Sequence, residues 1–301
     1  MPVPSYPEGP RPTSLVTLRG AGACGQGECV AWTAAAHAAF QDRMAAVPRG
    51  RWTLGTWAAA TGSYAGGACE RAALEAAAID LALRQRGTTV FGLLGVRPRP
   101  ARYVVSFEKV ADPAARARRE PPGIDLKVDA DPGWDDDTYA ALAALGRVAV
   151  LDFKGAGGVA AHERAHRALP AALIEDPQPG TSPWSASLAR RVSFDAPVTT
   201  ADALAALPVQ PAAVNVKPAR MGGVLEALEC VARCAATGIA VYIGGMFEVG
   251  IGRRQLWALA ALLCPEAPND VAPLAIGTEA PPRPQRLRID PGAAGFGGAG
   301  Y

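Results

Sequence analysis

From about residue 101 onward, short apolar runs alternate with helical segments, and this alternation constrains the fold more than any other feature. The runs that we predict as strands span residues 103–107, 124–128, 148–153, 172–176, 191–195, 212–216, 239–245 and 271–276. Strands that alternate with helices form parallel sheets, and eight such units close into a (β/α)8 barrel. The intervening helices are short, so we expect a compact or slightly imperfect barrel.

The residues before this alternation follow another pattern. SLVTLRG (14–20) and ECVAWTA (28–34) are predicted strands, joined by a Gly-rich turn at 20–25, and residues 30–48 and 68–86 are predicted helices. The turn matches G-x-G-x-x-G, but a dinucleotide-binding fingerprint must open a helix. A second strand follows here instead, so we predict a hairpin.

We therefore predict an α/β fold, a modified (β/α)8 TIM barrel with an N-terminal α+β capping domain. The expected boundaries are 1–100 for the cap, 101–277 for the catalytic barrel and 278–301 for a C-terminal segment that returns to the cap. The last segment is rich in Pro and Gly, which suits a connection rather than a core element.

Composition excludes several classes of function. The net charge is +2 with acids and bases interspersed, and no basic tract suggests nucleic acid. No uncharged apolar run reaches the roughly 18 residues of a membrane span, and the N-terminus lacks the apolar core of a signal peptide. The six cysteines are scattered without a C-x-x-C motif. We expect a reduced, cytoplasmic protein.

Lysine is scarce, and its placement is regular. Of the 30 basic residues, four are lysines, and all lie at the ends of predicted strands: Lys109, Lys127, Lys154 and Lys217. Arginine keeps its proton in proteins, whereas lysine can exchange one. Lysines at barrel strand ends are therefore candidates for acid/base chemistry. A GC-rich coding sequence, which favours arginine codons, is the alternative explanation.

Three carboxylates also end consecutive predicted strands: Asp152, Glu175 and Asp195. Carboxylate oxygens are the ligands that Mg²⁺ prefers, so these residues predict a metal site at the barrel mouth. Lys127 and Lys217 would lie on opposite sides of it. A metal that holds a substrate carboxylate stabilises the enediolate formed when an α-proton leaves, and either lysine would move that proton. Nearby cations would have to lower the lysine pKa for this role.

Four segments resemble the enolase superfamily in its muconate-lactonizing-enzyme branch. They are GQGECVAW (25–32), ERAALEAAAIDLALRQRGTTVFGLLG (70–95), VNVKPARMGG (214–223) and IAVYIGGMFEVGIGRR (239–254). That branch includes o-succinylbenzoate synthases, N-succinylamino acid racemases and dipeptide epimerases. The last two segments are the most specific match, because they resemble the strand-six lysine and the strand-seven segment of its synthases and racemases.

The resemblance implies roles for individual residues. Lys127 matches the second lysine of the family's K-x-K motif, a general acid/base, and Lys217 matches the lysine on the opposite face. Asp152, Glu175 and Asp195 match the ligands of Mg²⁺, with Mn²⁺ as the alternative ion. The further residues expected to bind substrate or support the site are Lys154, Asp176, Asn215, Arg220, Gly245, Met246 and Glu248.

The chain also departs from the family pattern. Asp125 replaces the first lysine of K-x-K, and Asp152-Phe153-Lys154 replaces a D-x-N pattern. Lys154 is two residues beyond Asp152, so both face the same way, and its ammonium would weaken metal binding or pair with a ligand carboxylate. A structural salt bridge from Lys154 to Glu175 or Asp176 is the alternative to an altered catalytic role.

Two supporting residues also have structural interpretations. Arg220 either binds an anionic substrate or is a surface charge on a loop. Glu248 either orients the substrate and its neighbours or is a structural acid at the start of a helix. The residues alone leave both alternatives open.

The resemblance implies a lyase or an isomerase/racemase that abstracts a proton α to a carboxylate, and o-succinylbenzoate synthase-type dehydration is the specific prediction. N-acyl amino acid racemisation and a muconate cycloisomerase-like reaction are alternatives, as is a non-catalytic descendant that binds ligands. A Schiff-base lysine aldolase is disfavoured, because it needs no carboxylate cage. Dipeptide epimerisation is also disfavoured, because only Asp270 stands where epimerases carry D-x-D. The expected partner is a small-molecule carboxylate substrate, with a homo-oligomer possible and neither nucleic acid nor membrane.

Overall fold

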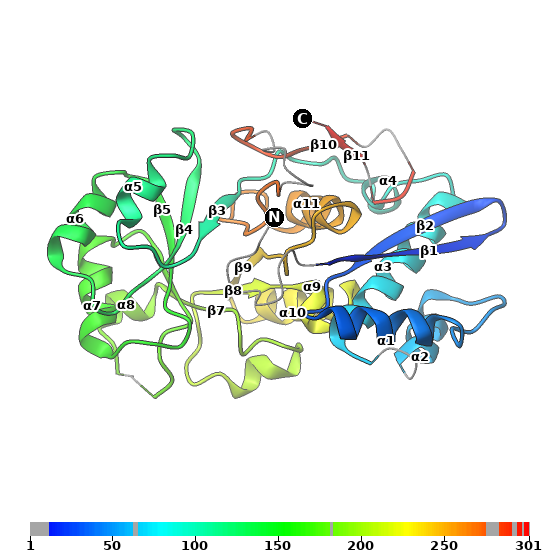
Figure 1. The fold of residues 1–301 in the computed structure, drawn as a ribbon, viewed down its shortest axis with the longest axis horizontal. Helices are drawn as coiled ribbons and strands as arrows, with labels where there is room; N and C mark the ends of the chain where they lie inside the picture. The colour runs from blue at the N-terminus through cyan, green and yellow to red at the C-terminus, as the bar shows by residue number, and fades with distance from the viewer. Residues whose placement is uncertain are drawn as a thin grey trace.

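The computed structural model describes residues 12–62, 66–180, 183–274, 283–290, 294–296 and 298–300. Figure 1 shows a β-hairpin with helices at one end and a curled parallel sheet with its covering helices at the other. The fold class predicted above is confirmed. Within the described residues, none of the helices combines the length and apolar character that crossing a bilayer requires.

The N-terminal hairpin is antiparallel, and its second strand begins earlier than predicted. β1 (Ser14–Gly20) pairs with β2 (Ala23–Cys29), so the residues assigned to a Gly-rich turn belong mostly to a strand. The reason is close packing against helix α3 (Ala68–Gln85). A Cβ on Gly25 would lie 2.2 Å from the Leu81 nitrogen, and a Cβ on Gly27 would lie 2.1 Å from the Ala73 oxygen. Only glycine permits this approach.

Three more helices complete the cap: α1 (Ala34–Met44), α2 (Leu54–Gly62) and α4 (Val90–Leu94). α3 and the hairpin enclose a small apolar core that includes Phe40, Trp57 and Leu74. Because α3 buries side chains on most of its surface, it can pack on the hairpin and on the barrel at once.

The parallel sheet follows chain order, as predicted for the first seven strands. Its members are β3 (Val104–Phe107), β4 (Asp125–Asp129), β5 (Val148–Asp152), β6 (Leu173–Glu175), β7 (Val192–Phe194), β8 (Ala213–Val216) and β9 (Ala240–Ile243). Parallel neighbours place all their carboxyl ends at one mouth of the sheet.

The eighth strand differs from the prediction for residues 271–276. Residues 271–274 form no strand, and 275–276 lie outside the described residues. Instead, Asn269 and Asp270 bridge the sheet's two edges, pairing with Tyr103 and Gly244. Pro268 and Pro273 flank this short connection. Proline has no N–H to offer a sheet ladder, so the strand stays short.

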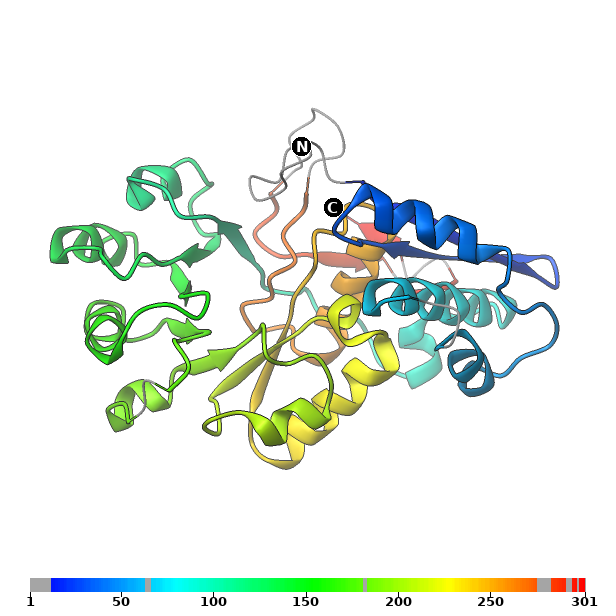
Figure 2. The same cartoon turned by 60° about the horizontal axis from the view of Figure 1, so that its bottom comes forward.

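The connecting helices are short, as expected. They are α5 (Pro113–Ala117), α6 (Asp136–Ala143), α7 (Val159–Ala168), α8 (Ala186–Ala189), the 3₁₀ turn η1 (Asp202–Ala206), α9 (Pro218–Met221), α10 (Val224–Ala236) and α11 (Ile251–Leu263). Figure 2 shows them along the outside of the sheet, and α9 packs against the cap helix α3. Their apolar faces join the sheet in one continuous core.

The described part of the C-terminal segment lies against the cap. β10 (Arg288–Asp290) pairs with β11 (Gly298–Gly300). Between them, the Gly295 nitrogen donates to the Thr88 oxygen at 2.9 Å, and the Phe296 nitrogen donates to Asp80 Oδ1 at 3.2 Å. Asp80 lies on α3, so this segment contacts the central helix of the cap.

Two carboxylates of the cap hold the first turns of two barrel helices. Glu28 on β2 accepts hydrogen bonds from the nitrogens of Val249, Gly250 and Gly252, at 2.8 to 3.0 Å, at the start of α11. Glu75 on α3 accepts from the Leu225 nitrogen at 2.9 Å, at the start of α10. Helix N-termini carry unpaired N–H groups and a partial positive charge, so these contacts dock the cap on the barrel mouth.

Candidate active site

The strand register places several polar residues at one level of the barrel. Asp129 is opposite Asp152, Asp152 is opposite Glu175, and Glu175 is opposite Ser193. Side chains alternate along a strand, so these residues share the interior face near the C-terminal mouth. Two of the expected metal ligands, Asp152 and Glu175, are therefore neighbours, and both are fully buried.

Lys127 lies beneath this level rather than at the strand end. β4 continues two residues beyond it to Asp129. The Lys127 ammonium contacts Glu175 Oε1 and lies 3.1 Å from Asp152 Oδ2 and 3.2 Å from Asp270 Oδ2. Its side chain is 2 % exposed, so all these charges meet away from water. An ammonium with three carboxylates is a fully paired buried cation.

The pKa of Lys127 is raised, whereas a lysine that acts as a base needs a lowered pKa. Burial disfavours its charge, but the carboxylates of Glu175, Asp270 and Asp152 outweigh burial and raise its pKa well above the usual value. Burial raises the pKa of Glu175, and Lys127 only partly offsets it. Burial also opposes ionisation of Asp152, yet Lys127 and Lys154 hold its pKa below the usual range. In this arrangement, Lys127 is a protonated acid.

Lys154 does pair with a predicted metal ligand, but not with Glu175 or Asp176. Its ammonium contacts Asp152 Oδ2 and lies 3.3 Å from Asp129 Oδ1. Its side chain is 51 % exposed, so it approaches Asp152 from the solvent side. Burial and Lys127 disfavour its charge, but Asp152 and Asp129 outweigh them and raise the pKa of Lys154.

Asp195 is paired with two cations from the segment after β8, Lys217 at its start and Arg220 in α9. Lys217 Nζ lies 2.8 Å from Asp195 Oδ2, and Arg220 Nη1 contacts Asp195 Oδ1. Burial opposes the charge of Asp195, but Lys217 and the other cations lower its pKa. Arg220 is therefore part of this cluster rather than a free surface charge. Asp195 as a metal ligand stays a prediction.

Asn215 is buried beside Lys217 with no partner for its amide. Neither Oδ1 nor Nδ2 has a hydrogen-bond partner among the described residues, although the residue is fully buried. A Cβ on Gly244 would lie 2.1 Å from Asn215 Oδ1 and 2.7 Å from Lys217 Cε. Glycine at 244 therefore leaves room for both side chains. An unpaired buried amide is costly unless a ligand or water completes its bonds.

The segment after β9 supports the mouth from the cap side. The Gly245 nitrogen donates to the Asp270 oxygen at 3.1 Å, and the Met246 nitrogen donates to Glu248 Oε2 at 2.8 Å. The backbone carbonyl oxygen of Glu248 accepts from Arg253 Nε at 2.7 Å. Burial raises the pKa of the Glu248 carboxyl group. Glu248 thus lies at the start of α11, which fits the structural interpretation of this acid.

Two non-glycine residues with left-handed backbone flank the carboxylates. Lys154 has φ 52° and Asp176 has φ 43°. Asp176 directly follows β6, and Lys154 is the second residue after β5. The Asp176 carboxylate accepts from the nitrogens of Asp195 and Ala196 at 2.8 and 2.9 Å. Such conformations cost about 1–3 kcal/mol each and concentrate at functional sites.

The donor set fits a divalent cation. Asp152, Glu175 and Asp176 each offer a buried carboxylate oxygen, and these atoms lie within 4.8 Å of one another. An all-oxygen set suits Mg²⁺ or Mn²⁺. The ammonium groups of Lys127 and Lys154 contact the same carboxylates, so a metal would compete with them for Asp152 and Glu175.

Sequence reasoning missed several members of this cluster. Asp129 is two residues beyond Lys127, and its inward position follows from strand alternation once β4 is extended. Tyr242 donates to Glu175 Oε2 at 2.5 Å from the opposite strand β9, and Ser106 donates to Asp270 Oδ1 at 2.5 Å. Nothing in the linear sequence links these pairs, because they join strands far apart in the chain.

Family comparisons cover both parts of the chain. Residues 97–277 match the model described as Domain of unknown function (DUF8230) C-terminal domain, and residues 7–92 match its N-terminal counterpart. The chain belongs to the DUF8230 family. Together, the two matches cover the cap and the barrel, and so include the carboxylate cluster described above.

Curated relatives match a short part of this DUF8230 chain. An N-succinylamino acid racemase of Amycolatopsis sp. is 49 % identical over 59 residues, and an o-succinylbenzoate synthase of Bacillus subtilis (strain 168) is 42 % identical over 59 residues. Each match covers 20 % of the DUF8230 chain and only 16 % of the relative's length. These are the synthase and racemase types that the motifs resemble.

Solved structures match nearly the whole chain. A dipeptide epimerase from Methylococcus capsulatus, complexed with Mg ion, has a TM-score of 0.78 and 24 % identity, with 95 % of this chain and 93 % of that chain covered. An enolase-superfamily protein from Enterococcus faecalis V583 has a TM-score of 0.72 and 20 % identity, with 96 % and 87 % covered. The DUF8230 chain has the enolase-superfamily fold, as its motifs predicted.

Proposed function

We propose that this protein is an enzyme of the enolase superfamily that abstracts a proton α to a substrate carboxylate. The observation that carries the proposal is the buried cluster of Lys127 with Asp152 and Glu175, which faces Lys217 and Asp195 across the strand ends. Acidic ligands with a lysine on either side suit the formation of an enediolate. The cap covers this mouth through Glu28 and Glu75.

Asp152 and Glu175 would hold a divalent cation together with Asp176 or Asp195, and Mg²⁺ is the proposed ion. When bound, this ion would supply Lewis-acid stabilisation of the charge that develops on the substrate carboxylate. Lys127 can act as a base only when Glu175 and Asp152 are released from its ammonium, because their charges raise its pKa. Lys217, already charge-paired with Asp195, would face the developing anion from the other side.

The specific reaction that we propose is o-succinylbenzoate synthase-type dehydration. Lys127 would take the α-proton and return a proton to the departing hydroxide, while Lys217 stays a cation opposite the enediolate. Support comes from the synthase match and from the asymmetry of the lysines. Lys127 is surrounded by carboxylates, whereas Lys217 contacts Asp195 beside Arg220.

The second candidate is racemisation of an N-acyl amino acid, favoured by the racemase match. It requires both lysines to exchange protons with the substrate, so Lys217 would need to lose its proton as readily as Lys127. A muconate cycloisomerase-like reaction would use the same cluster. We also propose the division into a cap over residues 1–100, a barrel over 101–277 and a returning C-terminal segment over 278–301.

The deciding experiment incubates the purified protein with Mg²⁺ and the cyclohexadiene precursor of o-succinylbenzoate and follows the ultraviolet absorbance of that precursor. Loss of absorbance that disappears in a folded Lys127→Ala variant supports the synthase and the base together. Without such turnover, deuterium exchange into N-succinyl amino acids tests the racemase. Failure of both reactions, with no Mg²⁺ effect on the melting temperature, would leave a non-catalytic ligand-binding protein as the better description.

A further inference from the structure

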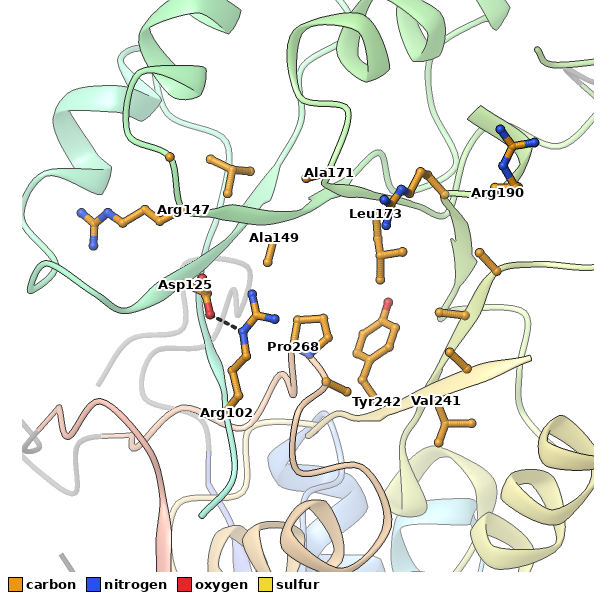
Figure 3. A pocket seen from close by; sticks show the side chains of 17 residues that line it. Arg102, Asp125, Arg147, Ala149, Ala171, Leu173, Arg190, Val241, Tyr242 and Pro268 are labelled. Atoms are coloured by element: carbon orange, nitrogen blue, oxygen red, sulfur yellow. Dashed lines mark hydrogen bonds and ion pairs between the residues drawn. The ribbon is translucent and has the colours of Figure 1, made fainter. Parts of the chain in front are cut away.

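A second cavity opens at the opposite mouth of the barrel. It has a volume of about 470 Å³ and is lined by residues at or just before the first positions of the strands, including Asp125, Val148, Leu173, Ala213 and Ala240. Figure 3 shows it from close by. The carboxylate cluster lies at the other ends of the same strands, so the two sites are separate.

Small side chains leave this mouth open. Its lining includes five alanines, which lie in or just before the strands: Ala149, Ala171, Ala212, Ala213 and Ala240. Pro268 and the ring of Tyr242 lie toward the same space in Figure 3. The result is a concave apolar floor of a size that suits a small organic molecule.

The rim of the cavity is strongly basic. The charged residues that line it are one acid, Asp125, and four arginines: Arg102, Arg147, Arg190 and Arg191. Arg102 Nε donates to Asp125 Oδ2 at 2.5 Å, which uses one edge of its guanidinium. The Arg147 side chain points away from the centre of Figure 3 and binds backbone oxygens of the β3–β4 connection, so its role is structural.

Arg190 and Arg191 differ from these two residues. Both are exposed, and neither has an ion pair or side-chain hydrogen bond among the described residues. Arginines near a helix C-terminus can stabilise the helix dipole. The helix before them, α8, has only four residues, so this role accounts for little of their charge. Two adjacent arginines without internal partners, beside a concave apolar floor, are available to a ligand.

One aromatic side chain contributes to both this cavity and the carboxylate cluster. Tyr242 lines the cavity, while its hydroxyl group reaches Glu175 Oε2 at 2.5 Å on the other side. The hydroxyl is therefore used within the protein, and the cavity meets the ring of Tyr242 rather than its polar end. Together with Leu173 and Pro268, this ring forms an apolar surface.

We propose that this cavity binds a small organic anion, a phosphate monoester or a carboxylate with a compact apolar body. The anionic group pairs with Arg190 and Arg191 at the rim, with Arg102 across the cavity from Arg190, and the apolar body packs on Leu173, Pro268 and the Tyr242 ring. Guanidinium groups match phosphate and carboxylate oxygens in geometry as well as in charge. This site opens at the opposite mouth of the barrel from the proposed catalytic cluster, and Tyr242 contacts both.

The test is calorimetric titration of the full chain with phenyl phosphate, and separately with benzoate, at low ionic strength. We expect saturable binding at one site that weakens as NaCl is raised. The double variant Arg190→Ala/Arg191→Ala should weaken binding by at least about tenfold. Ala240→Phe should weaken it similarly, because Ala240 is exposed at the rim and a phenyl ring there fills the cavity without disturbing the core.

The matched control is Arg19→Ala, which removes an exposed arginine from β1 in the cap and should leave binding unchanged. Circular dichroism of each variant establishes that it is folded. The proposal is overturned if neither probe binds, or if binding survives the double variant. It is also overturned if binding is lost in Lys217→Ala but retained in the double variant, because the anion would then lie at the other mouth. A preference for phenyl phosphate or for benzoate identifies the anionic group that the rim selects.

Discussion

Asp129 and Asp152 face each other as register partners on β4 and β5, and the Lys154 ammonium joins them at the mouth of the barrel. Lys154 has a left-handed backbone conformation, and its side chain contacts Asp152 at the end of β5. A cation is thereby fixed on one side of a proposed metal ligand. This arrangement separates the chain from the D-x-N pattern of the family that it resembles.

We expect Lys154→Met to raise the affinity for Mg²⁺ by about tenfold, the equivalent of about 1.4 kcal/mol. The substitution removes a positive charge that contacts Asp152 and would repel a second cation. Calorimetric titration with MgCl₂ measures the change. Lys109→Met is the control, because Lys109 is exposed and has no ion pair among the described residues. Unchanged or weaker Mg²⁺ binding in Lys154→Met would show that Asp152 is not a ligand.

Lys127→Met should destabilise the protein by about 3–5 kcal/mol, because it leaves buried carboxylates without their cation. The affected groups are Glu175, Asp152 and Asp270, which all lie near the Lys127 ammonium. Urea unfolding measures the loss. Added Mg²⁺ should restore more stability in the variant than in the parent protein, since it would replace the missing charge. A loss below about 1 kcal/mol, or an equal response to Mg²⁺, would contradict the geometry.

Glu28→Ala should cost about 2–3 kcal/mol of unfolding free energy, because hydrogen bonds to a charged group are the strong ones. The substitution leaves the nitrogens of Val249, Gly250 and Gly252 without their acceptor. Amide hydrogen exchange should accelerate at the start of α11, where the cap meets the barrel. Glu28→Gln, which keeps one acceptor oxygen, should lose less. Equal stability of parent and Glu28→Ala would mean that water replaces the carboxylate at no cost.

The buried carboxyl of Glu75 should make stability depend on pH. Burial raises its folded-state pKa above the ordinary value of 4.5, so the folded protein holds this proton more tightly than the unfolded chain does. The contribution is complete below the unfolded pKa and is lost as the pH rises through the folded pKa. From about pH 4 upward, the parent should therefore lose stability relative to Glu75→Gln.

Urea unfolding of both proteins across that range measures the difference. Glu226→Gln should weaken this pH dependence in part, because the charge of Glu226 also raises the pKa of Glu75. The interpretation fails if the free-energy difference between the parent and Glu75→Gln stays constant, or if it shifts in favour of the parent as the pH rises.

Much of the fold could be predicted because hydrophobic periodicity is local. The parallel strands from β3 to β9 and their short helices follow from runs of five to seven largely apolar residues that alternate with helical segments. The hairpin was predicted too, although β2 begins at Ala23, because Gly25 and Gly27 lie in a strand pressed against α3. From the sequence alone, a glycine that allows close packing cannot be distinguished from a glycine that a turn requires.

The sequence indicated some members of the buried cluster but not how its charged groups pair. The sequence brought Lys127, Asp152 and Glu175 to neighbouring strand ends, and the structure joins them. It did not indicate that Lys154 would choose Asp152 and Asp129, nor that Tyr242 would bond Glu175. Several charges lie within reach of one another here, so small differences in distance decide each partner.

By itself, the amino-acid sequence determined the order of the first seven parallel strands and their helices and the resemblance to one superfamily. Those properties depend on local periodicity and on contiguous motifs. Only the tertiary structure decided how Asn269 and Asp270 close the barrel, how the cations divide the carboxylates, and where the arginine-rimmed cavity opens. These features depend on register and on hydrogen bonds between segments far apart in the chain, and no local pattern encodes them.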